Sequence, residues 1–138
     1  MDNNIPNIKE LKGKITNYEI NDDLFYTIIS LLTIFPWFRK FLEKKWYNDE
    51  YELTTIIFWQ LIDYIEEKIE LNEIYEIKRI LSFLDLLSIS KNKEIINLVS
   101  VWFLENLDNY KEVLNFIIEI MPDNLKKIFL KWYWYYLD

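Results

Sequence analysis

Four carboxylates in the middle of the chain have a spacing that metal chemistry could use. They recur at intervals of three and four residues, which places them on one face of a helix: Asp63, Glu66, Glu67 and Glu70. Carboxylate oxygens bind Mg²⁺, and facing helices can hold a pair of metal ions. A di-iron bundle also needs a Glu-x-x-His partner, and the chain has no His. We therefore interpret the four acids as a solvated helix face and predict no metal site.

Two side chains that are common in enzyme active sites are missing, so that only carboxylate, Ser, Tyr or Lys chemistry remains open. The chain has no His and no Cys, which removes the commonest general acid and base, the thiolate nucleophile and the softer metal ligands. Gly13 is the one glycine, so a glycine-rich loop for nucleotide phosphates is also excluded. The sequence therefore predicts a protein that is not an enzyme and that needs no cofactor.

One further acid falls on an apolar segment. Glu105 lies at nearly the same helical angle as Leu98 and Val101, which places a carboxylate at the edge of an apolar surface. A buried acid needs a partner, such as a helix N-terminus or a cation, and Arg79 is one candidate. We predict a structural hydrogen-bonding role for Glu105.

A second group combines aromatic rings with acids. The stretch KKWYNDEYE falls between two predicted helices. Rigid rings supply buried area in protein interfaces, and carboxylates steer a basic partner toward them. The alternative is that the rings close the end of the helical domain while Asp49 caps the next helix. The predicted partner-binding residues of this region are Trp46, Tyr47, Asp49, Glu50 and Tyr51, with Glu66, Glu67 and Glu70 on the following helix.

The chain ends in KWYWYYLD, which contains five consecutive aromatic residues. On a helix, successive side chains point about 100° apart, so no single core face takes all five rings. Trp132 and Tyr136 continue the apolar face of the preceding turns, which leaves Tyr133, Trp134 and Tyr135 as candidates for partner contact. Stacking on nucleic acid requires a basic groove beside the rings, and only three lysines lie nearby, so we do not expect nucleic-acid binding.

These side chains must be positioned by helices, because apolar residues recur at helical spacing throughout residues 21–138. Asn, Asp and Pro separate the periodic segments at positions where helices begin. Seven helices and no strand are expected, at about 22–35, 36–47, 49–71, 72–90, 93–109, 110–121 and 123–138. Short loops join antiparallel neighbours. The sequence thus predicts an all-α fold, either a helical bundle or a HEAT-like stack of helical hairpins, in one domain behind a polar lead of residues 1–20.

Three details of this plan are specific. The segment 93–109 is apolar almost all the way round, so its helix is predicted to be central. Asn109 and Glu112 have the spacing of a capping box at the start of the next helix. The helix over 72–90 is expected to bury one stripe, made by Ile74, Ile77, Leu81 and Leu84.

The net charge of −7 is unevenly distributed. Residues 43–76 contain ten acids and three bases, and the acids and bases elsewhere balance. This distribution disfavours a protein that binds a phosphate backbone and favours a basic protein partner. The first residues lack the features of a signal peptide, and the longest uncharged stretch is too short to span a bilayer, so we expect a soluble cytoplasmic protein without membrane contact.

The order of these features resembles a family of small all-helical bacterial proteins classed as a domain of unknown function. The resemblance is carried by Phe35-Pro36 after an apolar helix, by the acidic long helix, and by the stretches RILSFLDLL and NLVSVWFLENL. It covers about residues 24–110, so KWYWYYLD lies outside it. Some members look like immunity proteins, which are encoded beside toxins and protect the producing cell. The resemblance implies no catalytic residues.

The expected function is therefore that of an immunity-type binding protein, which neutralises a basic toxin by occlusion. Charge would steer the partner, and aromatic anchors would then be buried. One alternative is a phage-encoded inhibitor of a host defence nuclease, in which the acids imitate nucleic-acid phosphates. Another is a structural helical protein that forms a homodimer through its C-terminal segment.

Overall fold

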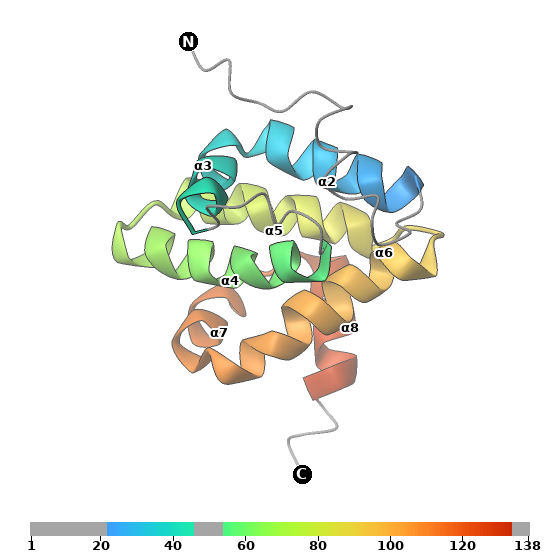
Figure 1. The fold of residues 1–138 in the computed structure, drawn as a ribbon. Helices are drawn as coiled ribbons and strands as arrows, with labels where there is room; N and C mark the ends of the chain where they lie inside the picture. Colours follow the sequence, from blue (N-terminus) through green and yellow to red (C-terminus); the bar gives the residue numbers. More distant parts are fainter. Residues whose placement is uncertain (1–21, 46–53, 134–138) are drawn as a thin grey trace.

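A computed structural model describes residues 22–45 and 54–133 of the chain, with side chains from 26–44 and 57–131. Within these ranges helices are joined by short turns and no strand is present, which confirms the predicted all-α fold (Figure 1). The elements in chain order are α2 (Asp22–Ile34), α3 (Pro36–Lys45), α4 (Thr54–Glu70), α5 (Ile74–Ser88), α6 (Lys93–Asn97), η2 (Leu98–Leu104), η3 (Glu105–Asn109), α7 (Lys111–Ile117) and α8 (Asp123–Tyr133). The predicted polar lead, residues 1–20, lies outside the described residues.

Local chemistry sets several helix boundaries. Pro36 begins α3, where its fixed φ is favourable and an N–H is not needed. Asn72 ends α4 with a φ of 57°, in the left-handed region that asparagine tolerates well. The amide of Glu73 then donates to the carbonyl of Lys68 at 2.9 Å, as expected for a helix that ends in this way. The side chain of Asn92 caps the start of α6.

Residues 93–109 form the continuous central helix that was predicted, but its hydrogen-bond pattern changes twice. It begins as the α-helix α6, widens to the π-helix η2 and tightens to the 3₁₀-helix η3. The η2 segment packs against α4, α5 and α8. Its buried residues are Leu98, Val99, Ser100, Phe103 and Leu104.

The core confirms most of the predicted inward positions. Ile77, Leu81 and Leu84 are fully buried on α5, but Ile74 retains 37% of its exposure, so its assignment to the core was wrong. Ile74 is the first residue of α5, and a helical side chain lies over the turn that precedes it. No preceding turn of α5 exists there, so this side chain is left partly in solvent.

The predicted capping box at Asn109 is not formed. Asn109 is the last residue of η3, and α7 begins at Lys111 without a side-chain cap. A capping residue needs a non-helical backbone, and the continuation of η3 through Asn109 removes it.

The helices that position the acidic region form an antiparallel hairpin, α4 and α5, joined by a turn at residues 71–73 (Figure 1). In Figure 1, α2 lies above α5, whereas α8 lies below it at a steep angle and packs against α5 and η2. A search of the described helices finds none with the length and apolar character needed to cross a membrane.

Candidate partner-binding surface

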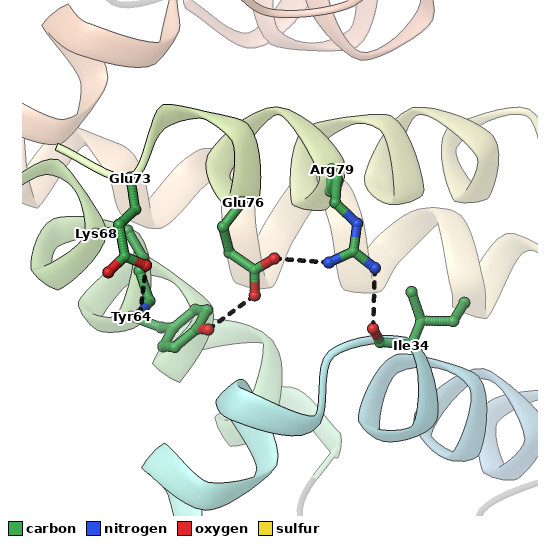
Figure 2. A network of polar contacts seen from close by, with 6 residues as sticks. All are labelled: Ile34, Tyr64, Lys68, Glu73, Glu76 and Arg79. Carbon is green, nitrogen blue, oxygen red and sulfur yellow. Dashed lines mark hydrogen bonds and ion pairs between the residues drawn. The ribbon is translucent and has the colours of Figure 1, made fainter. Parts of the chain in front are cut away.

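A series of polar contacts, two of them partly buried, lies beside the acidic region and joins three helices (Figure 2). The hydroxyl of Tyr64, on α4, donates to Oε2 of Glu76, on α5, at 2.8 Å. Arg79 donates from Nη1 to the other carboxylate oxygen, Oε1 of Glu76, at 2.8 Å. Its Nη2 donates to the carbonyl of Ile34, in the last turn of α2, at 3.1 Å. The network thus ties α4 to α5 and supplies a donor to a helix C-terminus.

The surroundings of Tyr64 keep its hydroxyl protonated. Burial raises the pKa of Tyr64 far above its ordinary value of 10.0, and the hydrogen bond to Glu76 and the negative charge of that carboxylate raise it further. The rings of Phe38 and Phe41 lie 5.2 and 5.4 Å from the Tyr64 ring. A neutral phenol that donates to a carboxylate is suited to holding helices together rather than to acid–base chemistry at neutral pH.

Arg79, which was one candidate partner for Glu105, binds other groups, and the predicted structural hydrogen-bonding role of Glu105 is not found among the described residues. Arg79 is bound to Glu76 and Ile34, and its guanidinium also lies 4.9 Å from the centre of the Phe35 ring. Glu105 is half-buried at the start of η3, and its carboxylate has no hydrogen bond or ion pair among the described residues.

Asp85 is the acid that binds a helix N-terminus. Its Oδ1 accepts a hydrogen bond from the amide of Leu125 at 2.8 Å, and its Oδ2 accepts one from the side chain of Asn124 at 3.2 Å. Asp85 therefore joins α5 to the first turn of α8. The sequence carried a signal for this residue, since Asp85 is the one acid inside the apolar stretch RILSFLDLL.

Three of the four acids singled out in the sequence form an exposed face, whereas Asp63, which was predicted to share it, is half-buried and engaged in an interaction. Glu66, Glu67 and Glu70 are exposed on the last turns of α4, as predicted. The cation among them is already engaged: Nζ of Lys68 lies 3.0 Å from Oε2 of Glu73 and 5.0 Å from the centre of the Tyr64 ring. A search of the described part of the chain finds no group of three or more side chains that could hold a metal ion.

Exposed apolar side chains accompany these acids at the turn between α4 and α5. Leu71 is 57% exposed, Ile74 is 37% exposed and Tyr75 is 78% exposed. Sequence reasoning missed this feature because it assigned Ile74 to the buried stripe of the helix after Asn72 and gave Leu71 and Tyr75 no role. We name the following residues the acidic turn: Glu66, Glu67, Glu70, Leu71, Glu73, Ile74 and Tyr75.

The other predicted partner-binding residues are not located by the structure. Those of the 46–53 segment and of the C-terminus lie outside the described residues: Trp46, Tyr47, Asp49, Glu50, Tyr51, Trp134 and Tyr135. Tyr133 is the last described residue of α8, and its side chain is outside the described part. Of the predicted binding residues, the structure therefore brings together Glu66, Glu67 and Glu70.

Comparison with known proteins identifies a family. Residues 28–135 match a domain of unknown function, DUF7674. This range includes residues 131–135, so the expectation that KWYWYYLD lies wholly outside the family was wrong. Neither the curated proteins nor the solved structures gave a match. Because the matched range covers most of the chain, this protein belongs to the family of the domain of unknown function DUF7674.

Proposed function

We propose that this protein is a non-enzymatic, immunity-type binding protein that neutralises a basic protein toxin by covering it with the acidic turn. The observation that carries the proposal is the exposure of Leu71, Ile74 and Tyr75 at a turn surrounded by carboxylates. Exposed apolar residues with a charged rim are typical of protein–protein contact sites.

The two parts of the acidic turn have different roles in this proposal. The apolar part supplies affinity, because full burial of a side chain such as Leu71 is worth about 1.5–3 kcal/mol. The carboxylates of Glu66, Glu67 and Glu70 have no ion pair among the described residues, so they are available to attract a basic surface. Lys68 does not oppose this attraction strongly, since Glu73 pairs with it.

The polar groups beneath the acidic turn favour binding over catalysis. Both oxygens of Glu76 are engaged, one by Tyr64 and one by Arg79. These groups hold α4 and α5 in register and present the exposed residues on a rigid hairpin, which lowers the entropic cost of binding.

The proposal is tested by isolating the protein from its own host with its bound partner. The matched variants are Glu66→Gln/Glu67→Gln/Glu70→Gln and, as a control that removes three acids elsewhere, Glu112→Gln/Glu119→Gln/Asp123→Asn. We expect wild type and control to retain a basic protein whose affinity falls with rising salt. The first variant should bind it about tenfold or more weakly. Equal affinity of the two variants, or an affinity independent of salt, would contradict the proposal.

The apolar part is tested on the same complex. Tyr75→Ala is expected to weaken binding about tenfold or more, because exposed aromatic residues are frequent hot spots. Leu130→Ala, at a 47% exposed position on α8, is the control and should leave the affinity unchanged. A toxin encoded beside this protein would support the immunity role, whereas a host nuclease as the partner would favour the alternative of a phage-encoded inhibitor.

A further inference from the structure

A second exposed surface lies between α2 and α5. It consists of two adjoining depressions that share Ile34, Phe83 and Leu86. The larger has a volume of about 610 Å³ and lies toward the C-terminal end of α5, and the smaller, of about 390 Å³, lies toward its N-terminal end. We name this surface the α2–α5 groove; its main lining residues are Tyr26, Ser30, Ile34, Phe83, Leu86 and Lys91.

The groove is bounded by α2, which supplies Tyr26, Ser30 and Ile34, and by α5, which supplies Phe83 and Leu86. Two contacts join α5 to the C-terminal end of α2 and the residue after it. There the rings of Phe35 and Phe83 meet edge to face with centres 5.7 Å apart, and Arg79 donates to the carbonyl of Ile34. Beyond these contacts the two helices leave apolar side chains uncovered.

The exposed residues of the groove are large and apolar. Leu86 is 67% exposed, Tyr26 is 55% exposed and Ile34 is 43% exposed. Contiguous apolar surface of this kind on a folded chain marks an interaction site more often than single exposed residues do.

The charge of the groove is opposite to that of the protein as a whole. Its described lining residues include Lys78, Arg79 and Lys91 and no acid, although the net charge of the chain is −7. Neither Lys78 nor Lys91 forms an ion pair among the described residues, and they lie in the two different depressions. A groove with an apolar floor and a cation at each end complements an acidic ligand.

The walls of the groove restrict the backbone form of that ligand. Both walls are helices, whose backbone N–H and C=O groups bond within the helix, so an added strand would find no partners. A ligand that is itself a helix pairs its own backbone groups and needs only side-chain contacts. The 15 residues of α5 correspond to a length of about 22 Å, enough to support about four turns of a docked helix.

We propose that the α2–α5 groove binds an acidic amphipathic helix of a protein partner. The apolar residues of the partner helix, spaced at i, i+3, i+4 and i+7, face Ile34, Phe83 and Leu86 of the groove. The acidic residues that flank them face Lys78 and Lys91. This surface adjoins the acidic turn at Tyr75, which lines the smaller depression, but it differs from the acidic turn in charge, so the inference does not rest on the proposed toxin partner.

The test uses the full chain and synthetic peptides of about 18 residues. One peptide has leucines at helical spacing and glutamates beside them, a second has lysines in place of the glutamates, and a third has the first composition in scrambled order. We expect saturable binding of the glutamate peptide, tighter at low salt, and at least about tenfold weaker binding of the other two. Comparable binding of all three would overturn the proposal.

Matched variants locate the binding site. Leu86→Glu should weaken binding of the glutamate peptide about tenfold or more. Leu130→Glu, at an exposed position on α8, should leave this binding unchanged. The Lys78→Glu/Lys91→Glu variant should bind the lysine peptide more tightly than the glutamate peptide. The Lys127→Glu/Lys131→Glu variant should still prefer the glutamate peptide. An unaltered circular dichroism spectrum and melting temperature for Leu86→Glu exclude misfolding as the cause. Retention of wild-type affinity by Leu86→Glu would overturn the assignment of the site.

Two further measurements exclude other occupants of the groove. A wild-type dimer that Leu86→Glu converts to a monomer, seen by light scattering, would assign the groove to a second copy of the chain and overturn the proposal. Protection of amides in residues 1–21 from hydrogen exchange, lost in the same variant, would assign it to the chain's own N-terminal segment and also overturn it. Unchanged peptide binding by Glu66→Gln/Glu67→Gln/Glu70→Gln is expected, which keeps this test separate from that of the acidic turn.

Discussion

Tyr64 is a buried hydroxyl whose partner comes from a different helix. Its hydrogen bond to Glu76 satisfies a polar group that would otherwise be costly to bury. Arg79 binds the same carboxylate, so the charge of Glu76 is neutralised where it meets the core. At the scale of single residues, the network therefore contributes to stability through mutual satisfaction of its members, and each member is expected to be sensitive to substitution.

Tyr64→Phe should lower the free energy of unfolding by about 1–2 kcal/mol, because the carboxylate of Glu76 loses one donor. Chemical denaturation near pH 7 measures this effect. Tyr75→Phe is the control and should change stability by less than about 0.5 kcal/mol, since Tyr75 is 78% exposed. A loss of equal size in both variants would show that the buried hydrogen bond is unimportant.

The raised pKa of Tyr64 also predicts a dependence on pH. The folded state holds the phenol proton more tightly than the unfolded state, so the contribution of Tyr64 to stability is complete below the ordinary pKa of 10.0 and is lost as the pH rises above it. The stability difference between wild type and Tyr64→Phe should therefore narrow from about pH 9 to about pH 11. A stability difference that stays constant over this pH range would contradict a raised pKa of Tyr64 in the folded state.

At the scale of elements, Asp85 decides how α8 joins the rest of the molecule. The first turn of a helix has amides without partners inside the helix, and the carboxylate of Asp85 accepts from one of them, that of Leu125. An acid at this end of α8 is also favourable for the helix dipole. The docking of α8 on α5 thus depends on a polar contact as well as on the burial of Leu125 and Phe129.

Asp85→Ala should destabilise the protein by about 1–2 kcal/mol and should increase hydrogen exchange selectively in α8. Asp85→Asn retains an oxygen acceptor, so its free energy of unfolding is expected to fall by less than that of Asp85→Ala. Asp108→Ala serves as the control, because Asp108 forms an exposed ion pair with Lys111 and such pairs contribute little. Exchange that increases uniformly over the chain would argue against a local role in docking α8.

At the scale of the whole molecule, charge is segregated between two surfaces. The acidic turn lies at the junction of α4 and α5, and the α2–α5 groove has a cation at each end, Lys78 on α5 and Lys91 in the connection to α6. Like charges at i and i+4, such as those of Glu66 and Glu70, destabilise a helix when they are not screened. This repulsion is expected to lower the stability of the helix at the acidic turn.

Glu66→Gln/Glu67→Gln/Glu70→Gln should raise the free energy of unfolding at low salt by about 0.5 kcal/mol, because it removes this repulsion. Wild type should gain stability as salt is added, and the variant should gain less. Thermal unfolding at several salt concentrations measures both effects. Lower stability of the variant at low salt would show that these carboxylates are structurally required.

Helix positions were predictable because the signals that set them are local. The spacing of Ile77, Leu81 and Leu84 and the presence of Pro36 and Asn72 act within a few residues of the chain. Helical periodicity also predicted that Glu66, Glu67 and Glu70 share one exposed face. The apolar half of the acidic turn was missed because exposure at a helix end depends on whether another element covers it.

The sequence by itself thus determined an all-α fold, an acidic middle and a chain without His or Cys. Only the tertiary structure decided which acids are bound: Glu76 by Tyr64, 12 residues away, and Asp85 by Leu125, 40 residues away, while Glu105 has no partner among the described residues. It also decided that α2 and α5 leave a groove between them. Periodicity and capping act over one or two turns of helix, whereas polar partners and uncovered surfaces depend on the packing of elements far apart in the chain.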